Sequence, residues 1–488
     1  MQTVVLAAGR GTRMRPLTDR RPKPMLPVAD RPLVAHTVEA AVAAGADRIV
    51  LVVGDSTDVA TDGDSTDGIV DGASAGVVTD GASSIERYFD ASPVGVPLEY
   101  VVQTERLGTA DAVRTAAASL DDAPFVVLNG DALFDRGGLA DLYAGGPAVA
   151  CLRVDDPSQY GVLDVESGGS SDDAESSGAS GDDASDGASG DDASDDGAGG
   201  ESNEAFGVPS SSGRVTGVVE KPADPPSDLV NAGAYQFPAA ALEWLDVPRS
   251  ERGEHELTDV LARAIEHVDV RPVPLERWLD VGRPWELLAA NEWKVTERTV
   301  AAPIHSGEGQ TSASEYSGQT DARVMGDGEI SPDATLLGPV VVEAGATVRE
   351  GVTLEGPVLI RSGATVGPNA YVRGTTVIGP DASVGHAVEI KNSVLMREAT
   401  VNHLSYVGDS ILGRGTNLGA GTVVANLRHD DEPVKLTVTG ERVSTGRRKF
   451  GVVLGDDAKT GIDTSLNAGV TLSTGANTAP GETVRRDR

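Results

Sequence analysis

The sequence contains very little cysteine and very little lysine. Cys151 is its one cysteine, so an internal disulfide is excluded, and a single thiol suits a reducing compartment. Only seven of the 40 basic residues are lysines, and 75 acidic residues give a net charge of -35. This acidity argues against nonspecific binding to nucleic acid or to an anionic membrane.

Long apolar runs are also missing. No stretch reaches the roughly eighteen apolar residues that span a bilayer, and the N-terminal MQTVVLAAGR is too short and glycine-rich for a signal peptide. We therefore expect a cytoplasmic protein. A chain that is acidic and poor in lysine resembles the cytosolic proteins of extreme halophiles, whose carboxylates stay hydrated in concentrated salt. An ordinary acidic protein is the alternative.

Two segments concentrate the acidity. Residues 167–205 consist almost wholly of Ser, Gly, Asp and Ala, with twelve acidic and no basic residues. Residues 55–84 are a milder case, with seven acidic residues and no basic ones. Because the first segment has too little apolar surface to offset its loss of conformational entropy, we predict a disordered insertion over about 166–213 and an acidic loop over about 55–84.

The last third of the sequence contains an internal repeat of six residues. The positions between its aliphatic residues are mostly Gly, Pro, Asn, Asp and Thr, which favour turns. The repeating residues are Leu336, Val342, Val348, Leu354, Ile360, Val366, Val372, Ile378, Val384, Ile390 and Met396. The register slips after Met396, is interrupted between Leu427 and Phe450, and then returns weakly as far as Val484. Each hexad predicts one short strand and one corner, and three hexads make a triangular coil.

This pattern resembles the left-handed parallel β-helix of the hexapeptide-repeat acyltransferases. The resemblance implies acyl transfer and a homotrimer in which each site draws residues from two chains. A slip or an insertion lets side chains leave the regular wall, so we expect function at those places. The alternative is a structural coil that only holds subunits together.

The N-terminus joins a buried strand to a glycine-rich loop. The strand pattern covers Thr3–Ala7, and GRGTRM (residues 9–14) follows it directly. The backbone N–H groups of such a loop close on phosphate, and its arginines add positive charge. Together with KPMLPV (residues 23–28), the loop resembles the signature of the sugar-1-phosphate nucleotidyltransferases.

That resemblance covers about residues 1–296. It implies a Rossmann-like α/β domain over 1–296, a linker over 297–331 and the β-helix over 332–488. It also implies the ligand contacts. The nucleotide is expected to meet Ala8, Gly9, Gly11, Gln103, Gly108 and Thr109. The sugar phosphate is expected to meet Gly161, Glu220, Lys221 and Asn231.

Two carboxylates complete the expected nucleotidyl-transfer site. Asp131 follows a hydrophobic strand, and ligands of open α/β sheets bind beyond the carboxyl ends of the strands. By resemblance, Asp280 is the second oxygen ligand of an Mg²⁺ ion. Attack of a sugar phosphate on a nucleoside triphosphate brings negative charges together, so Arg13 and Lys23 are expected to neutralise them with Mg²⁺. No covalent nucleophile is required, because the attacking phosphate is already ionised.

Within the β-helix, polar residues resemble the acetyltransferase half of the bifunctional enzymes that acetylate glucosamine-1-phosphate and then uridylylate it, in their archaeal branch. An imidazole has an ordinary pKa of about 6.5 and suits removal of the amine proton, so His403, near the slip in register, is expected to be the general base. The sugar phosphate is expected to meet Arg373, Lys391, Tyr406 and Asn417. Acetyl-CoA is expected to meet Ala420, Asn426 and Lys435, although a solvated basic loop is the alternative for Lys435.

Several functions remain open from the sequence. The leading hypothesis is glucosamine-1-phosphate acetylation with acetyl-CoA, followed by uridylyl transfer from UTP. A glucose-1-phosphate uridylyl- or thymidylyltransferase with a structural β-helix is the first alternative, and a regulatory subunit with a degenerate site is the second. The sequence does not decide between UTP and dTTP, because Gln103 can read either base, nor does it identify the sugar.

Overall fold

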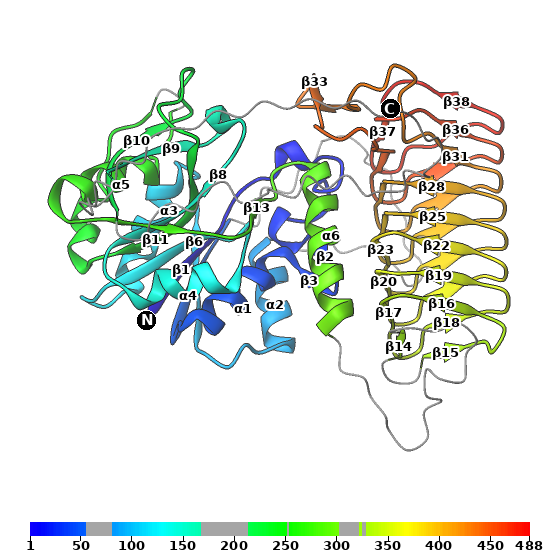
Figure 1. The fold of residues 1–488 in the computed structure, drawn as a ribbon, viewed down its shortest axis with the longest axis horizontal. Helices are drawn as coiled ribbons and strands as arrows, with labels where there is room; N and C mark the ends of the chain where they lie inside the picture. The colour runs from blue at the N-terminus through cyan, green and yellow to red at the C-terminus, as the bar shows by residue number, and fades with distance from the viewer. Residues whose placement is uncertain (55–80, 167–212, 251–252, 302–321, 325–327) are drawn as a thin grey trace, which may run out of the picture.

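The structure is a computed structural model that describes residues 1–54, 81–166, 213–250, 253–301, 322–324 and 328–488. An N-terminal α/β unit lies beside a long coil of short strands, and helix α6 (Pro284–Ala301) faces the coil (Figure 1). The predicted acidic insertion and most of the acidic loop fall outside the described residues. The end of that loop is an exception, because helix α2 (Gly81–Ala91) begins inside it.

The N-terminal unit is built on a nine-stranded sheet with the order β10-β9-β11-β6-β1-β4-β5, in which β8 pairs with β11 and β12. Strands β1, β4, β5 and β6 run parallel, and β11 is antiparallel to β6. The strands are β1 (Gln2–Ala7), β4 (Arg48–Gly54), β5 (Leu98–Gln103), β6 (Phe125–Asn129), β8 (Ala148–Arg153), β9 (Gly161–Glu166), β10 (Arg214–Glu220), β11 (Leu229–Phe237) and β12 (Arg271–Pro274).

Helices cover both faces of this sheet. Successive residues of β1 enter different cores: Val4 joins the cluster under α3 (Thr109–Ala116) and α5 (Leu257–His267), and Val5 joins the one under α1 (Leu33–Ala44) and α4 (Arg136–Ala144). A strand buried on both faces is a continuous apolar run, as the sequence shows. No helix among the described residues has the length and apolar character needed to cross a bilayer.

The C-terminal half is a left-handed parallel β-helix with three sheets, as predicted. Sheet 1 contains β14 (Ala322–Val324), β17 (Val340–Val342), β20 (Val358–Ile360), β23 (Thr376–Ile378), β26 (Val394–Leu395), β29 (Ile411–Leu412), β34 (Val453–Leu454) and β37 (Thr471–Leu472). Sheet 2 contains β15 (Glu329–Ile330), β18 (Thr347–Val348), β21 (Thr365–Val366), β24 (Ser383–Val384), β27 (Thr400–Val401), β30 (Asn417–Leu418) and β35 (Lys459–Thr460). Sheet 3 contains β16 (Thr335–Leu337), β19 (Thr353–Glu355), β22 (Tyr371–Arg373), β25 (Glu389–Lys391), β28 (Tyr406–Gly408), β31 (Val423–Val424), β36 (Ser465–Leu466) and β38 (Thr483–Val484).

The repeating aliphatic residues stack inside the coil, with one correction. Leu395, and not the predicted Met396, occupies the interior, whereas Met396 faces the N-terminal unit. The slip in register therefore comes before Met396, because only five residues separate Ile390 from Leu395. A second five-residue step separates Val407 from Leu412. Both steps shorten the corner that leads from sheet 3 to sheet 1.

The coil begins earlier than the sequence predicts. β14 pairs with β17 and β15 pairs with β18, although both short strands fall in the predicted linker 297–331. Helix α6 also enters that range, because it continues to Ala301. The described part of the predicted linker thus consists largely of helix and strand.

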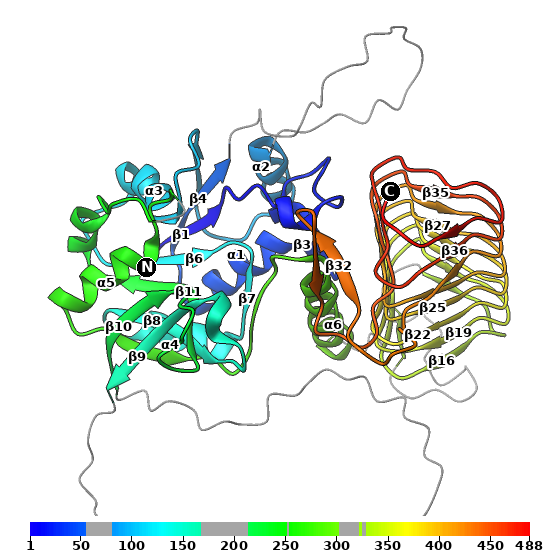
Figure 2. The same cartoon turned by 90° about the horizontal axis from the view of Figure 1, so that it is seen from above.

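Sheet 1 docks against the N-terminal unit through outward-facing aliphatic residues. These are Val341, Leu359, Val377, Val394, Ile411 and Val453. They share one apolar cluster with Leu287 and Trp293 of α6 and with Met14 and Leu17 of the glycine-rich loop. The inserted hairpin of β32 (Lys435–Val438) and β33 (Glu441–Ser444) contributes Leu436 to the same cluster and lies between the two halves (Figure 2).

Candidate active sites

The glycine-rich loop folds back on the KPMLPV segment. Gly11 has a φ of 64°, and a Cβ at this position would come within 2.7 Å of the Lys23 Cβ. The Thr18 hydroxyl donates to the Gly11 carbonyl at 2.8 Å and closes the loop. Only glycine combines this backbone conformation with such close packing. The result is that Arg13 and Lys23, far apart in the signature, face the same site.

Lys23 lies between two carboxylates. Its Nζ donates to Asp131 Oδ2 at 2.6 Å, and its side chain is only 6% exposed. Asp280 reaches the same place because β13 (Trp278–Asp280) pairs with β7 (Ala132–Phe134), which sets Asp280 opposite Ala132. Burial lowers the pKa of Lys23, but Asp131 and Asp280 outweigh it and leave the pKa raised. Burial, and next the Asp131 carboxylate, raise the pKa of Asp280.

This pair of carboxylates fits a magnesium ion that is completed by substrate. Two oxygen ligands in a buried place, each raising the electrostatic cost of the other, are the surroundings that a divalent cation relieves. Throughout the described ranges, no three His, Cys, Asp or Glu side chains converge on one metal position. Mg²⁺ in nucleotide sites is commonly held by one or two carboxylates together with substrate phosphates, so two protein ligands suffice.

Helix α6 begins at the same site. The Gly282 N–H donates to Glu286 Oε2 at 2.7 Å, which ties the segment after Asp280 to the first turn of the helix. Burial, and next the charge of Asp280, raise the pKa of Glu286 to about 7. A Cβ at Gly282 would lie 3.4 Å from Arg13 Nη2, so this guanidinium borders the carboxylates.

The predicted sugar-phosphate residues lie together where β9, β10 and β11 adjoin. Glu220 pairs with Gly161 across the β9–β10 ladder, and a Cβ at Gly161 would come 3.0 Å from Glu220 Oε2. Asn231 donates to the Tyr235 hydroxyl at 2.7 Å and accepts from the Gly233 N–H at 2.9 Å. Lys221 Nζ lies 3.6 Å from Glu220 Oε1. Its charge lowers the pKa of Asp280, but by less than the charges of Lys23 and Arg13 do.

The predicted base-binding residues are already used to hold their own loop. Gln103 is buried, and its amide donates to the Gly108 carbonyl at 3.2 Å and to Asp111 Oδ2 at 2.8 Å. Gly108 has a φ of 117°, and a Cβ there would lie 2.4 Å from the His255 carbonyl oxygen. The Thr109 hydroxyl accepts from the Leu257 N–H at 2.8 Å. These residues shape the loop before α3, so only their remaining atoms are free to meet a base.

The first residues of the glycine-rich loop differ in surroundings. Ala8 is buried beneath the loop, whereas Gly9 is exposed. A Cβ at Gly9 would meet no atom within 4 Å, so its neighbours in the protein do not require glycine there. Gly9 thus leaves open space at the carboxyl end of β1, where a phosphate would approach the backbone.

A charged face covers the outside of sheet 3. Arg373 and Lys391 are neighbours across the β22–β25 ladder, and Glu389 and Tyr406 are neighbours across the β25–β28 ladder. Arg373 Nη2 lies 3.0 Å from Glu389 Oε1. Burial lowers the pKa of Lys391, against an opposing effect of Asp409. Three of the four predicted C-terminal sugar-phosphate residues, Arg373, Lys391 and Tyr406, therefore share this face.

A hydrogen-bonded group holds Tyr406 in place. The Asn426 amide donates to the Tyr406 hydroxyl at 3.2 Å and to Asp409 Oδ2 at 2.5 Å. A Cβ at position 408 would lie 2.5 Å from that hydroxyl, so Gly408 makes room for it. Asp409 also accepts from Asn392 at 3.0 Å, and Asn392 donates to Glu292 of α6 at 2.8 Å. This group belongs to the two shortened corners.

His403 lies at a different corner, between sheets 2 and 3. The step from Val401 to Val407 is a regular six residues, so the predicted link between His403 and the slip in register is wrong. The ring is exposed, and its Nδ1 accepts from the His386 N–H at 3.3 Å. A neutral imidazole has one donor and one acceptor, so this contact puts the proton on Nε2. Nε2 can accept an amine proton only in the other tautomer, in which Nδ1 carries the proton and no longer accepts from the His386 N–H.

The remaining acetyl-site residues fall at two corners. Ala420 lies one coil further along than His403, because the N–H of the adjacent Gly421 donates to the His403 carbonyl. The Ala420 carbonyl accepts in turn from the Asp463 N–H of the following coil. Asn417 begins β30 in sheet 2 and accepts from Asn402 at 2.8 Å. Asn426 and the exposed Lys435, by contrast, lie where the chain leaves sheet 3 for the inserted hairpin. A single chain does not bring Ala420 and Lys435 together.

The N-terminal unit matches the family model described as nucleotidyl transferase, over residues 2–175 and 185–297. Residues 354–476 match a second model, described as the GMPPB C-terminal domain. The chain is 33% identical over 472 residues to the bifunctional protein GlmU of Methanocaldococcus jannaschii, covering 96% of this chain and 91% of that protein. It is 28% identical over 491 residues to the bifunctional sugar-1-phosphate nucleotidylyltransferase/acetyltransferase of Sulfurisphaera tokodaii, covering 100% and 98%.

The chain belongs to the bifunctional GlmU family. The prediction of a nucleotidyltransferase with a second, acetyltransferase, activity is thereby confirmed.

In this GlmU family member the signature residues of the N-terminal site converge, as the strand order and the glycine-rich loop predict. The sequence interpretation did not single out Asp409 and Asn392, which tie the acetyl face to α6. Their signal was present as two five-residue steps in a six-residue repeat. The step from Val407 to Leu412 agrees with the sequence pattern, whereas the first step is predicted after Met396 instead of before Leu395, because both residues are apolar and either one fits the pattern.

Proposed function

We propose that this chain catalyses the last two steps of UDP-N-acetylglucosamine formation in the cytoplasm. The β-helix acetylates glucosamine-1-phosphate with acetyl-CoA, and the N-terminal unit transfers uridylyl from UTP to N-acetylglucosamine-1-phosphate and releases pyrophosphate. The observation that carries the proposal is Lys23 held between the strand-end carboxylates of Asp131 and Asp280. This arrangement suits a reaction that gathers phosphates around one centre.

In the N-terminal site, the protein binds and orients two anions. Asp131 and Asp280 would hold Mg²⁺, which supplies positive charge to the triphosphate. Lys23 is pre-placed by its bond to Asp131, and Arg13 borders the same space from the glycine-rich loop. Lys221 and Glu220 would hold the phosphate and hydroxyls of the sugar. Positioning and charge neutralisation are the expected sources of rate in such transfers.

In the β-helix, His403 would accept the amine proton as nitrogen attacks the thioester carbon and the CoA thiolate leaves. Arg373 and Lys391 would hold the sugar phosphate on the outer face of sheet 3, beside the Tyr406 hydroxyl. Because Ala420 and Lys435 lie at different corners, we propose that a homotrimer joins the two parts from neighbouring chains. Closed rotational symmetry makes each such interface repeat around the ring.

An activity matrix tests the proposal. The purified chain, in concentrated KCl with Mg²⁺, is given glucosamine-, galactosamine-, N-acetylglucosamine- or glucose-1-phosphate, with UTP or dTTP, with and without acetyl-CoA. We expect free CoA thiol only with amino sugars, and pyrophosphate from glucosamine-1-phosphate only when acetyl-CoA is present. Fast pyrophosphate release from glucose-1-phosphate, without any CoA release, would favour a single-activity enzyme with a structural β-helix.

A further inference from the structure

We propose that the β-helix positions the nucleotidyl-transfer loop, through a buried ion pair between Arg21 and Asp456. The inference rests on the proposed uridylyl transfer and adds a positioning role for the C-terminal half. Residues 14–22 form the spacer between the two signature cations, Arg13 and Lys23. This spacer is the part of the N-terminal unit that reaches the last coils of the β-helix.

The ion pair is almost free of solvent, and one guanidinium nitrogen contacts both carboxylate oxygens. Arg21 Nη2 lies 2.8 Å from Asp456 Oδ1 and 2.6 Å from Oδ2, with side-chain exposures of 11% and 3%. Burial lowers the pKa of Arg21, against the opposing charge of Asp456. Asp456 also accepts from the Arg414 N–H at 2.8 Å, so its position is set by the coil. Separating the two leaves the buried charge of Arg21 without its carboxylate, whereas Asp456 keeps Arg414 Nε at 3.3 Å, so the guanidinium follows the carboxylate.

Neighbouring contacts also attach the spacer to the β-helix. Arg20 pairs with Asp457, and the Thr474 hydroxyl donates to Asp19 Oδ2 at 2.9 Å. Met14 and Leu17 are buried in the cluster that includes outward residues of sheet 1. The spacer residues in these contacts all lie between Arg13 and Lys23, so the spacer is attached to the β-helix at several points.

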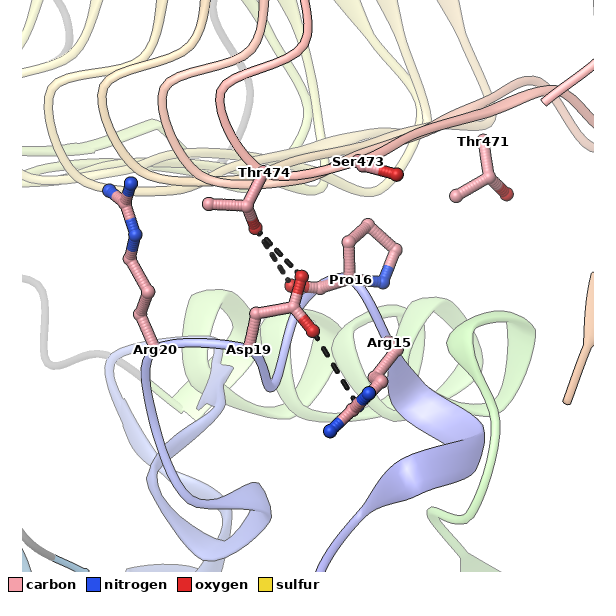
Figure 3. Close-up of a pocket in the computed structure, with 7 residues that line it drawn as sticks. All are labelled: Arg15, Pro16, Asp19, Arg20, Thr471, Ser473 and Thr474. Atoms are coloured by element: carbon pink, nitrogen blue, oxygen red, sulfur yellow. Dashed lines mark hydrogen bonds and ion pairs between the residues drawn. The ribbon is translucent and has the colours of Figure 1, made fainter. Parts of the chain in front are cut away.

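The attachment is made at points and not by continuous packing. A cavity of about 510 Å³ lies between the spacer and the last coils, lined by Arg15, Pro16, Asp19 and Arg20 on one side and by Thr471, Ser473 and Thr474 on the other (Figure 3). The open space leaves one side of the spacer without continuous packing, so its separate contacts hold it in place. The Arg21–Asp456 pair is the most buried of its ion pairs with the β-helix and the one nearest to Lys23 in the chain.

The catalytic consequence follows from distance along the chain. Pro22 alone separates Arg21 from Lys23, and Lys23 Nζ makes its 2.6 Å contact with Asp131. A displacement of about 1 Å in a positioning group costs on the order of a hundredfold in rate. Loss of the ion pair should thus lower the turnover of nucleotidyl transfer without removing any group that touches substrate.

The test compares Asp456→Asn and Arg21→Ala with the native full-length chain. We expect kcat for nucleotidyl transfer to fall about ten- to a hundredfold, with acetyl transfer close to native. Breaking a buried ion pair also lowers the temperature of cooperative unfolding, so the rates are compared well below that temperature, where each variant is folded. Millimolar guanidinium chloride should partly restore Arg21→Ala, whereas an equal concentration of KCl should not. Arg21→Lys, which keeps the charge but has a shorter reach and loses the Nη1 contact with Met396 Sδ, should lie between native and alanine.

Arg361→Ala is the matched control. Arg361 also bridges the two halves, with Nη1 donating to the Ala29 carbonyl at 3.1 Å and Nε donating to Glu343 at 2.8 Å, but it does not touch the spacer. Its variant should keep the native kcat. A native kcat in folded Asp456→Asn and Arg21→Lys, or an equal loss in Arg361→Ala, would overturn the inference. Absence of nucleotidyl transfer from the native chain would instead refute the proposed function.

Discussion

Replacing Lys23 by methionine tests how the N-terminal site balances its charges. The ammonium is 6% exposed and donates to Asp131, while the half-buried Asp280 carboxylate lies beside it. Removing one partner of a buried ion pair typically costs about 3–5 kcal/mol. Because Asp131 is 32% exposed and water reaches it in part, we expect the lower end, about 3 kcal/mol of unfolding free energy.

Denaturant unfolding with and without Mg²⁺ measures this effect. A divalent cation between the carboxylates replaces the lost charge, and a ligand stabilises the state that binds it, so Mg²⁺ should stabilise the Lys23→Met variant more than the native chain. Nucleotidyl transfer should be lost, because the phosphates lose a cation, while acetyl transfer stays native.

Lys294→Met is the control for this substitution. Lys294 pairs with Glu297 at 2.9 Å, but Glu297 is 53% exposed, so this pair should contribute at most about 1 kcal/mol. Equal losses of unfolding free energy in Lys23→Met and Lys294→Met would refute the cost assigned to the half-buried carboxylates. An identical response to Mg²⁺ in Lys23→Met and in the native chain would refute the shared position of ammonium and metal.

Four further substitutions test the remaining assignments. Asp131→Asn and Asp280→Asn should each abolish pyrophosphate release and leave acetyl transfer intact; loss of both at equal stability would contradict independent sites. His403→Ala should slow acetyl transfer by about 10²–10⁴-fold with uridylyl transfer unchanged, and a near-native rate would make His403 a structural residue of its corner. Burial lowers the pKa of His36 to about 4, whereas the same imidazole in the unfolded chain has a pKa of about 6.5. Below about pH 6.5 the unfolded chain therefore binds a proton that the native chain does not. Native stability should then drop by about 1 kcal/mol between pH 7 and 5.5, and equal drops in native and His36→Gln chains would refute that assignment.

Much of the architecture could be predicted from local patterns. A strand buried on both faces, followed by a glycine-rich loop, predicts where β1 ends and where a phosphate would approach. Asp131 follows β6, which pairs with β1 in parallel, so the carboxyl ends of both strands meet at one edge. Asp280 could be assigned only by resemblance, because the β7–β13 pairing that delivers it joins segments about 150 residues apart.

The sequence by itself determined the coil, since one regular coil of the β-helix takes three hexads and an aliphatic residue fills nearly every interior position, with Thr460 as an exception. It did not determine which outer face meets the N-terminal unit. Residues that face outward are not part of the six-residue apolar repeat. Val341, Leu359 and Val377 become buried only because α6 covers them. The same holds for Asp456 and Glu292: ordinary acidic residues in an acidic chain acquire their roles only when the tertiary structure sets Arg21 and Asn392 beside them.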